Sequence, residues 1–314
     1  MRGRIVKGVG NFFDVFVESG EFNNQIIRCN SKGIFRFERE SIKPLAGDSV
    51  EIAINKDNKG ELLGIIQKIH GRKNFLNRPP VANLDILFIV AAVKSPPPAY
   101  FFIDKLTACA IYNDIEPVII INKTDLLDEG VECELYDIYD NAGFKAVKVS
   151  AVLESGAGFD EIKQEMRGKI CAFAGASGVG KSSILNRLFG LNLETGGLSE
   201  KIGRGKHTTR TLELFRHDMD GFAADTPGFS MLDFDYIDVK DRDIKESTRE
   251  ILKEGLIRVF PDLHEYADGC RYRGCTHLKE DGCGVLSAVA EGAAAKSRHE
   301  SYTELYGYLK SGKG

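Results

Sequence analysis

The order of three short motifs constrains this chain more than any other feature of its sequence. Asn122–Asp125 (NKTD) comes first, Gly175–Ser182 (GASGVGKS) second and Asp225–Gly228 (DTPG) third. Each motif follows a short apolar run, which is typical of a buried strand. In a doubly wound α/β sheet, ligand-binding loops gather at the carboxyl ends of the strands, in whatever order the chain visits them. The sequence therefore predicts that the three motifs form one site.

The segment Gly175–Ser182 has the spacing of a phosphate-binding loop between Lys169–Gly175, a predicted buried strand, and Ser183–Gly190, a predicted helix. Backbone N–H groups of such a loop and the N-terminus of its helix converge on phosphate oxygens. Lys181 can reach the β- and γ-phosphates, and the hydroxyl of Ser182 can coordinate Mg²⁺. The alternative is a glycine-rich turn with a surface lysine. The expected nucleotide contacts are Gly175, Ala176, Ser177, Gly178, Val179, Gly180, Lys181, Ser182 and Ser183.

The motif Asn122–Asp125 has the residues that read a guanine base. The carboxylate of Asp125 can accept hydrogen bonds from N1–H and the 2-amino group of guanine, and adenine offers neither donor. Such a tetrapeptide also occurs by chance, so its meaning depends on the strand Glu116–Asn122 before it. Another apolar run ends at Ser150, where a backbone N–H can support the base. The expected base contacts are Asn122, Lys123, Thr124, Asp125, Ser150 and Ala151.

The motif Asp225–Gly228 is typical of a loop that senses the terminal phosphate. Asp225 can hold Mg²⁺ through water, and the N–H of Gly228 can reach the γ-phosphate. The next residue is Phe229, where many GTPases place a glutamine that orients the attacking water. An apolar ring cannot do this, so another group must take that role.

The glycine-rich stretch 190–210 stands where a GTPase has its first switch loop, and it ends in GKHTTR. Thr209 is the expected second Mg²⁺-binding hydroxyl, ahead of Thr208. His207 is the nearest candidate to replace the missing glutamine, and the alternative is an ordinary solvated histidine. With Lys181, the predicted catalytic set is His207, Lys181 and Thr209.

In an ordinary GTPase the base-reading motif comes last, whereas here it comes first. The chain is therefore predicted to carry a circularly permuted α/β P-loop GTPase domain that begins with the strand Asn83–Ala92. Permutation is tolerable because the loops need proximity in space rather than a fixed order. One consequence is that the loop after Gly228 leads directly into the C-terminal part of the chain.

The composition limits what can surround this domain. With 314 residues, 43% of them hydrophobic, the chain can form two or three domains, and its net charge of −4 says little about partners. The sequence has no apolar run of roughly 18 residues that would span a membrane, and no hydrophobic stretch of a signal peptide follows the N-terminus. We therefore expect a cytoplasmic protein that does not enter the membrane, and a monomer.

Residues 1–72 predict a small β-barrel, because five short strand-like runs are separated by Gly, Asn and Pro. This pattern favours an oligonucleotide-binding (OB) fold, with an SH3-like barrel as the alternative. The predicted strands are Gly3–Val9, Phe12–Glu18, Gln25–Cys29, Asp48–Ile54 and Leu62–Ile69. Basic and aromatic residues of the kind that bind RNA run through the segment: Arg2, Arg4, Lys7, Phe12, Arg28, Lys32, Phe35, Arg36, Phe37 and Arg39. The following Gly71–Pro80 predicts a linker.

The seven cysteines fall into two groups. Four stand in apolar settings and are expected to be reduced core residues: Cys29, Cys109, Cys133 and Cys171. The other three cluster with a histidine in the spacing C-x4-C-x-H-x5-C, which suits a closed, tetrahedral, structural Zn²⁺ site. The predicted ligands are Cys270, Cys275, His277 and Cys283. A disulfide is the alternative, but it would leave one of the three cysteines unpaired.

The predicted zinc segment also carries charged and aromatic side chains. Arg271, Tyr272, Arg273 and Lys279 are interleaved with its ligands and predict either an RNA contact or a solvated face. Helices are expected on both sides of the segment, over Asp241–Arg258 and Gly284–Leu309.

Taken along the whole chain, these features resemble the family of ribosome small-subunit-dependent GTPase A, the RsgA or YjeQ family. The resemblance rests on the order NKxD, GxxxxGKS, GKHTTR and DTPGF between a predicted OB barrel and the predicted zinc segment. It implies a factor in late assembly of the small ribosomal subunit that contacts its rRNA. Such a factor binds the subunit in the GTP state, hydrolyses GTP when the subunit stimulates it, and leaves as the GDP form.

The resemblance also implies roles for particular residues. It places the phosphate loop on Gly175–Ser183, the base motif on Asn122–Asp125 and the hydrolytic histidine on His207. It implies one structural zinc ion on the four ligands above. The Mg²⁺ expected with GTP at Ser182 and Thr209 follows from the motifs themselves. Family members are associated with maturation of the decoding region and with release of other assembly factors.

We therefore predict three domains: an OB-fold RNA-binding domain over 1–72, the permuted GTPase over 73–230 and an α-helical zinc-binding domain over 231–314. A second function class is an RNA-binding scaffold that holds GTP without significant turnover. It would not need Asp225, Thr209 and His207 in addition to a base pocket. A third, a GTP-driven metal chaperone, would need an exchangeable metal site, whereas a closed Cys₃His set is structural.

Overall fold

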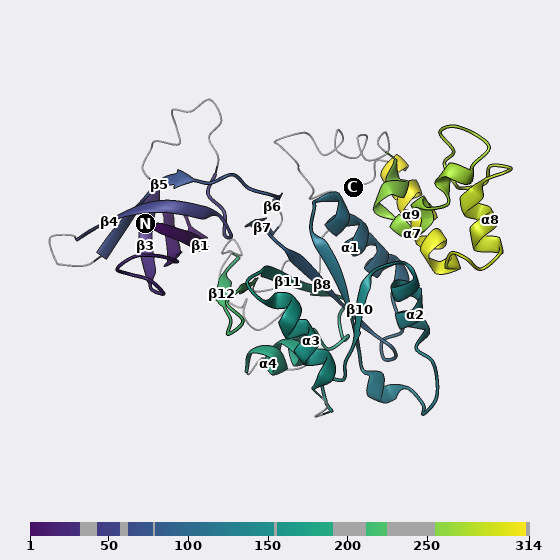
Figure 1. Ribbon diagram of the computed structural model, residues 1–314, viewed down its shortest axis with the longest axis horizontal. Coiled ribbons are helices and arrows are strands. Elements are labelled where there is room, and N and C mark those ends of the chain that lie inside the picture. The colour runs from purple at the N-terminus through teal and green to yellow at the C-terminus, as the bar shows by residue number, and fades with distance from the viewer. Residues whose placement is uncertain are drawn as a thin grey trace.

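The computed structural model describes residues 1–31, 43–56, 62–77, 79–153, 156–190, 212–224 and 255–311. These residues form a β-barrel, a central α/β unit and a C-terminal helical unit, with the α/β unit between the other two (Figure 1). The predicted fold class, an OB-type barrel followed by a P-loop α/β domain and a helical unit with a Cys₃His cluster, is confirmed.

The N-terminal barrel is closed by five strands in the order β1-β2-β3-β5-β4. The strands are β1 (Arg2–Val9), β2 (Phe12–Val17), β3 (Ile26–Ser31), β4 (Ser49–Lys56) and β5 (Leu62–Ile69). Strands β3 and β5 pair in parallel while the other pairs are antiparallel, which is the Greek-key order of the OB fold. Alternate residues such as Ile5, Val15 and Ile66 point inward and are fully buried.

The predicted linker Gly71–Pro80 stands between the barrel and the central unit and overlaps a short hairpin. The hairpin pairs β6 (Phe75–Asn77) with β7 (Pro80–Ala82). Arg72 donates from Nε and Nη2 to the two carboxylate oxygens of the buried Asp48, each at 2.7 Å. This bidentate pair ties the start of the segment to the barrel.

The central sheet has the order β10-β9-β8-β11-β13-β12. Its strands are β8 (Ile86–Ala92), β9 (Glu116–Asn122), β10 (Lys145–Lys148), β11 (Ile170–Gly175), β12 (Leu214–Arg216) and β13 (Phe222–Ala224). All pairs are parallel except β12 with β13. The chain runs outward from β8 to β10 and then returns to β11 beside β8. The topological switch point therefore lies between β8 and β11, where such sheets bind ligands.

Helices cover both faces of this sheet because the inner strands are apolar on both sides. Leu87 and Ile89 of β8 pack towards α1 (Tyr100–Tyr112) and α2 (Glu134–Asn141). Phe88 and Val90, which point the other way, pack towards α3 (Ala157–Met166) and α4 (Lys181–Phe189).

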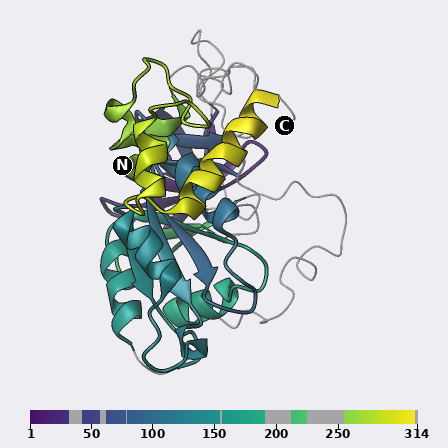
Figure 2. The ribbon, with the colours of Figure 1, turned by 90° about the vertical axis from the view of Figure 1, so that its right-hand side faces the viewer.

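The C-terminal unit is a set of four short helical segments and the longer α9, packed against α1 and continuous with the core on that face. They are η5 (Leu256–Val259), α7 (Pro261–His264), η6 (Ala267–Gly269), α8 (Gly284–Ala290) and α9 (Lys296–Ser311). The predicted helical stretch after the cysteines is interrupted at Gly292, whose φ of +78° favours glycine, so α8 and α9 are separate. In Figure 2 this unit faces the viewer, with α8 and α9 at the yellow end of the colour range.

The four cysteines predicted to lie in the core, Cys29, Cys109, Cys133 and Cys171, are all buried as free thiols. Within the part of the chain that the structure describes, no helix has both the length and the apolar character needed to cross a membrane.

Candidate nucleotide and metal sites

The base-reading and phosphate-binding motifs meet at the carboxyl edge of the sheet. Asn122 ends β9 and Gly175 ends β11, on either side of β8, and Ser150 follows β10. The structure therefore brings together the first two motifs that the sequence predicted to share a site.

The side chain of Asn122 joins three loops at this edge. Its Nδ2 donates to the carbonyl of Val179 at 2.8 Å, and its Oδ1 accepts from the N–H of Ala151 at 3.1 Å. Asn122 is almost fully buried, at 1% exposure, so its bond to Val179 is shielded from water, and its bond from Ala151 is partly shielded. A Cβ at Gly180 would lie 2.3 Å from Nδ2 of Asn122, and φ there is +92°, so only glycine allows this close approach.

Lys123 and Thr124 hold the base motif to its neighbours. Lys123 has a left-handed backbone, with φ of +63°, and its ammonium donates to the carbonyls of Ser95 and Gly178, the latter at 2.7 Å. The hydroxyl of Thr124 donates to the carbonyl of Val149 at 3.0 Å. The motif is thus anchored to the phosphate loop on one side and, on the other, to Val149 just after β10.

The carboxylate of Asp125 is exposed and already oriented. The hydroxyl of Ser150 donates to its Oδ1 at 2.6 Å. A carboxylate oxygen has further acceptor capacity, so this geometry leaves the group able to accept the two N–H donors of a guanine edge.

The phosphate loop runs from Gly175 to the N-terminus of α4. Positive φ values at Gly178 (+81°) and Gly180 (+92°) make the tight turn that glycine permits. Ser182 and Ser183 lie in the first turn of the helix, where N–H groups lack intrahelical partners. Burial lowers the pKa of the Lys181 ammonium. The negative charge of a bound phosphate would act in the opposite direction and favour the charged ammonium.

The residues of the two predicted switch loops lie outside the described ranges. These are His207, Thr208, Thr209, Asp225, Gly228 and Phe229. Strand β13 ends at Ala224, directly before Asp225 in the sequence, and pairs in parallel with β11.

The four predicted zinc ligands converge in the C-terminal unit, with their ligand atoms all within 4.8 Å of one another. Sγ of Cys270 lies 3.4 Å from Nδ1 of His277 and 3.8 Å from Sγ of Cys283. Sγ of Cys283 lies 3.5 Å from the same nitrogen. A tetrahedral zinc ion, with Zn–S of about 2.3 Å and Zn–N of about 2.05 Å, requires about 3.8 Å between sulfurs and about 3.6 Å from sulfur to nitrogen. The residues therefore fit zinc, and the three cysteines are free thiols in the structure.

The loop that carries these ligands is held by further hydrogen bonds, and the sequence did not single out their main acceptor, Glu280. Glu280 accepts from the N–H groups of Thr276 and Leu278, each at 3.0 Å. A further hydrogen bond from the Thr276 hydroxyl is the main reason that the pKa of Glu280 falls to about 2. Tyr302 of α9 donates to the Thr276 carbonyl at 3.0 Å. These bonds hold the loop in the shape that faces His277 towards the sulfurs.

Comparison with known families shows which protein family the chain belongs to. The family model described as RsgA GTPase matches residues 69–235, and the RsgA N-terminal domain matches residues 2–62. The chain belongs to the RsgA family of GTPases. The curated RsgA of Caldanaerobacter subterraneus subsp. tengcongensis, named small ribosomal subunit biogenesis GTPase, is 40% identical over 311 residues, covering 99% of this chain and 96% of the relative. The protein of that name from Alkaliphilus metalliredigens is 37% identical over 314 residues, covering 99% of each.

Solved structures of RsgA relatives support the same assignment. The chain matches YloQ, described as a circularly permuted GTPase, with a TM-score of 0.73 and 32% identity, over 100% of this chain and 96% of that one. It matches YjeQ from Thermotoga maritima with a TM-score of 0.73 and 33% identity, over 100% and 99%. The predictions of a GTPase and of circular permutation are confirmed.

A buried ion-pair cluster joins the C-terminal unit of this RsgA chain to the GTPase unit. Arg298 of α9 is fully buried and donates from Nη1 to Asp104 of α1 at 2.6 Å and from Nη2 to Asp262 of α7 at 2.7 Å. Tyr139 of α2 donates to the same oxygen of Asp104 at 2.8 Å. No sequence pattern pointed to this cluster, because its members lie far apart in the chain.

The barrel contacts the hairpin β12–β13 at the other end of the RsgA chain. Lys7 pairs with Glu213 at 2.5 Å, and the rings of Phe16 and Phe222 meet edge to face at 5.5 Å. Lys7 was predicted among the RNA-binding residues, yet in this structure it faces the GTPase unit. On the barrel surface, the Arg28 guanidinium lies 4.9 Å from the centre of the exposed Phe12 ring.

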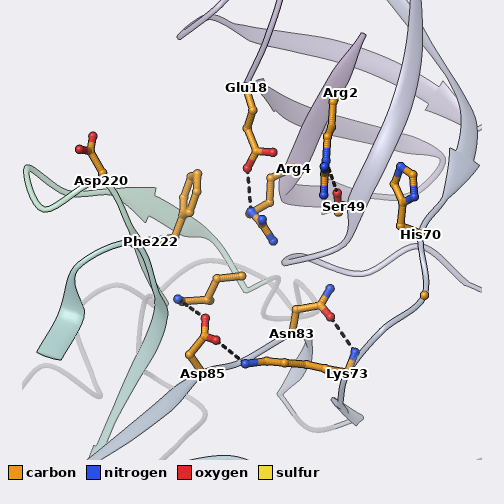
Figure 3. Close-up of a pocket in the computed structure, with 13 residues that line it drawn as sticks. Arg2, Arg4, Glu18, Ser49, His70, Lys73, Asn83, Asp85, Asp220 and Phe222 are labelled. Carbon is orange, nitrogen blue, oxygen red and sulfur yellow. Dashed lines mark hydrogen bonds and ion pairs between the residues drawn. The ribbon is translucent and has the colours of Figure 1, made fainter.

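A polar cleft of about 380 Å³ lies beside this contact (Figure 3). It is at the amino edge of the sheet, where Ile170 begins β11, and so is separate from the nucleotide site at the opposite edge. Two ion pairs lie within it, Arg4 with Glu18 at 3.0 Å and Lys73 with Asp85. The cleft is a polar seam between barrel and sheet.

Proposed function

We propose that this protein hydrolyses GTP as an assembly factor of the small ribosomal subunit. It binds the subunit in the GTP state, hydrolyses GTP when the subunit stimulates it, and dissociates in the GDP state. The observation that carries the proposal is the buried Asn122 junction, which locks a guanine-reading loop to a phosphate loop in a permuted order. Full-length similarity to proteins named for small-subunit biogenesis supports the ribosomal role.

In the proposed site, each residue does one part of the work. Asp125 accepts the guanine N–H donors, and Lys181 and the loop N–H groups hold the phosphates. Ser182 and Thr209 are the proposed protein ligands of Mg²⁺, with Asp225 reaching it through water. When bound with the nucleotide, the ion would neutralise phosphate charge. His207 is the proposed group that orients the attacking water, since Phe229 cannot.

The proposed RNA contacts lie on both outer units. On the barrel, the pair of Arg28 and exposed Phe12 offers a stacking face with a positive charge. On the zinc loop, Arg271 lies 5.5 Å from the ring of Tyr272, which is 50% exposed. Arginine and aromatic planes of this kind bind unpaired bases. We propose rRNA of the small subunit as the partner of both surfaces.

The zinc ion is proposed as a single structural cofactor on Cys270, Cys275, His277 and Cys283. The same proposal includes three domains, with boundaries at 1–72, 73–230 and 231–314. It also includes a monomeric state, a cytoplasmic location and action alongside other assembly factors.

Co-sedimentation with purified small subunits tests the proposal against the alternative of a GTP-holding scaffold. Three samples are compared, with GTP, with a non-hydrolysable GTP analogue and with GDP. The enzyme-switch proposal expects retention with the analogue, weak binding with GDP and progressive release with GTP. A scaffold without turnover would be retained equally with GTP and the analogue, and that result would contradict the proposal.

A further inference from the structure

The loop that positions Asp125 is held by a side chain from the helix after the phosphate loop. Arg187 of α4 donates from Nη1 to the carbonyl of Ser150 at 3.0 Å and also to the carbonyl of Leu153. Its guanidinium carbon lies 4.2 Å from the centre of the Phe159 ring on α3. The planar group is therefore fixed by two acceptors and by an aromatic face.

The two carbonyls that Arg187 binds stand at the two ends of one tight turn. Inside this turn, the Ser150 hydroxyl accepts from the N–H of Leu153 at 3.2 Å and donates its single proton to Asp125 at 2.6 Å. Because a hydroxyl has one proton, accepting from Leu153 directs that proton to the carboxylate. The turn thus sets where the base-reading carboxylate points.

We propose that Arg187 is a positioning residue for guanine recognition. It closes the turn 150–153 from outside, and through Ser150 it orients Asp125 towards the N1–H and 2-amino donors of the base. The inference rests on the proposed function, since it concerns the same nucleotide site. It adds a specificity determinant that lies outside the base motif, on the helix whose N-terminus faces the phosphates.

The test compares binding of GDP, inosine diphosphate and pyrophosphate by calorimetry with Mg²⁺ present. Inosine diphosphate lacks the 2-amino group, so it can donate only one hydrogen bond to Asp125. Its affinity therefore depends less on how the carboxylate is oriented. Arg187→Met keeps the aliphatic stem over Phe159 but removes the donors, and Arg187→Lys keeps the charge. Arg167→Met is the matched control, because Arg167 is an exposed arginine at the end of α3.

We expect Arg187→Met to bind GDP about tenfold more weakly or worse, with a smaller loss for inosine diphosphate. The preference for GDP over inosine diphosphate should therefore shrink, while pyrophosphate binding stays at the native level. The GDP affinity of Arg187→Lys should lie between those of the native protein and Arg187→Met. This second variant keeps the test valid if Arg187→Met does not fold. The Arg167→Met control should match the native protein for all three ligands.

Two results would overturn this inference. One is native GDP affinity in both Arg187 variants, and the other is an equal loss for GDP and inosine diphosphate with their ratio unchanged, which would mean general structural support. A native protein that binds GDP no more tightly than ADP would instead refute the proposed function. The two failures are therefore distinguishable.

Discussion

Replacing Arg298 with alanine should destabilise the C-terminal unit strongly. The arginine is fully buried, and its partners Asp104 and Asp262 are 1% and 8% exposed. Arg298→Ala leaves both carboxylates buried without a cation and removes the guanidinium plane that lies 4.8 Å from the centre of the Phe260 ring. Breaking a buried ion pair by deleting one partner costs about 3–5 kcal/mol. We expect a loss of unfolding free energy in that range.

Urea unfolding with linear extrapolation measures this loss. The chain has no tryptophan, so far-UV circular dichroism is the appropriate signal. Arg258→Ala is the matched control, because Arg258 is an exposed arginine in the same unit and its loss should change stability by no more than about 0.5 kcal/mol. If Arg298→Ala loses no more stability than Arg258→Ala, the argument from buried charge is refuted.

The same variant has an expected pH dependence. Burial raises the pKa of Asp104, and Arg298 opposes that rise in the native protein. Without the arginine, the folded-state pKa of Asp104 moves further above its unfolded value, so protonation favours the folded state. That contribution is fully present below the unfolded pKa and is lost as pH rises through the folded pKa. The stability deficit of Arg298→Ala should therefore shrink as pH falls from about 8 to about 5; a deficit that is constant with pH would contradict this assignment.

Three further predictions concern the proposed chemistry. Asp125→Asn should lose at least about a hundredfold in GTP affinity by calorimetry and gain a preference for xanthosine triphosphate, and native GTP affinity would remove Asp125 from the base site. Native protein purified without added metal should contain one zinc per chain. Cys275→Ser should lose it and unfold residues 262–284 by circular dichroism while GTP binding survives, since structural zinc contributes on the order of 10 kcal/mol of folding free energy; iron or no metal in the native protein would refute the zinc assignment. His207→Ala should bind GTP and the small subunit normally but lose most of a stimulation of roughly 10³-fold or more in single-turnover hydrolysis, and full stimulation in the variant would exclude His207 from the mechanism.

Local sequence predicted the elements that depend on local chemistry. The loop Gly175–Ser182 and the motif ending at Asp125 lie at strand ends because apolar strands and glycine turns are encoded by adjacent residues. The cluster of Cys270 with Cys275, His277 and Cys283 could also be predicted, because these four residues lie in one short segment with a characteristic spacing.

Features that depend on tertiary packing could not be predicted from the sequence. Arg298 looks like any surface arginine of a helix, and only the fold brings Asp104, nearly two hundred residues earlier, within 2.6 Å of it. Arg187 likewise gains its partners at Ser150 and Leu153 from the packing of α4 beside the turn. Lys7 fitted an RNA-binding pattern by composition, but its direction was set by the docking of the barrel on the sheet.

Single-turnover hydrolysis of GTP, with and without purified small ribosomal subunits, tests the central claim most directly. The protein is loaded with limiting GTP and Mg²⁺, and phosphate release is followed in both samples. With Phe229 in place of a water-orienting glutamine, we predict slow hydrolysis by the free protein and an acceleration of roughly 10³-fold or more on the subunit. Equal rates in the two samples would contradict a GTPase that the small subunit activates.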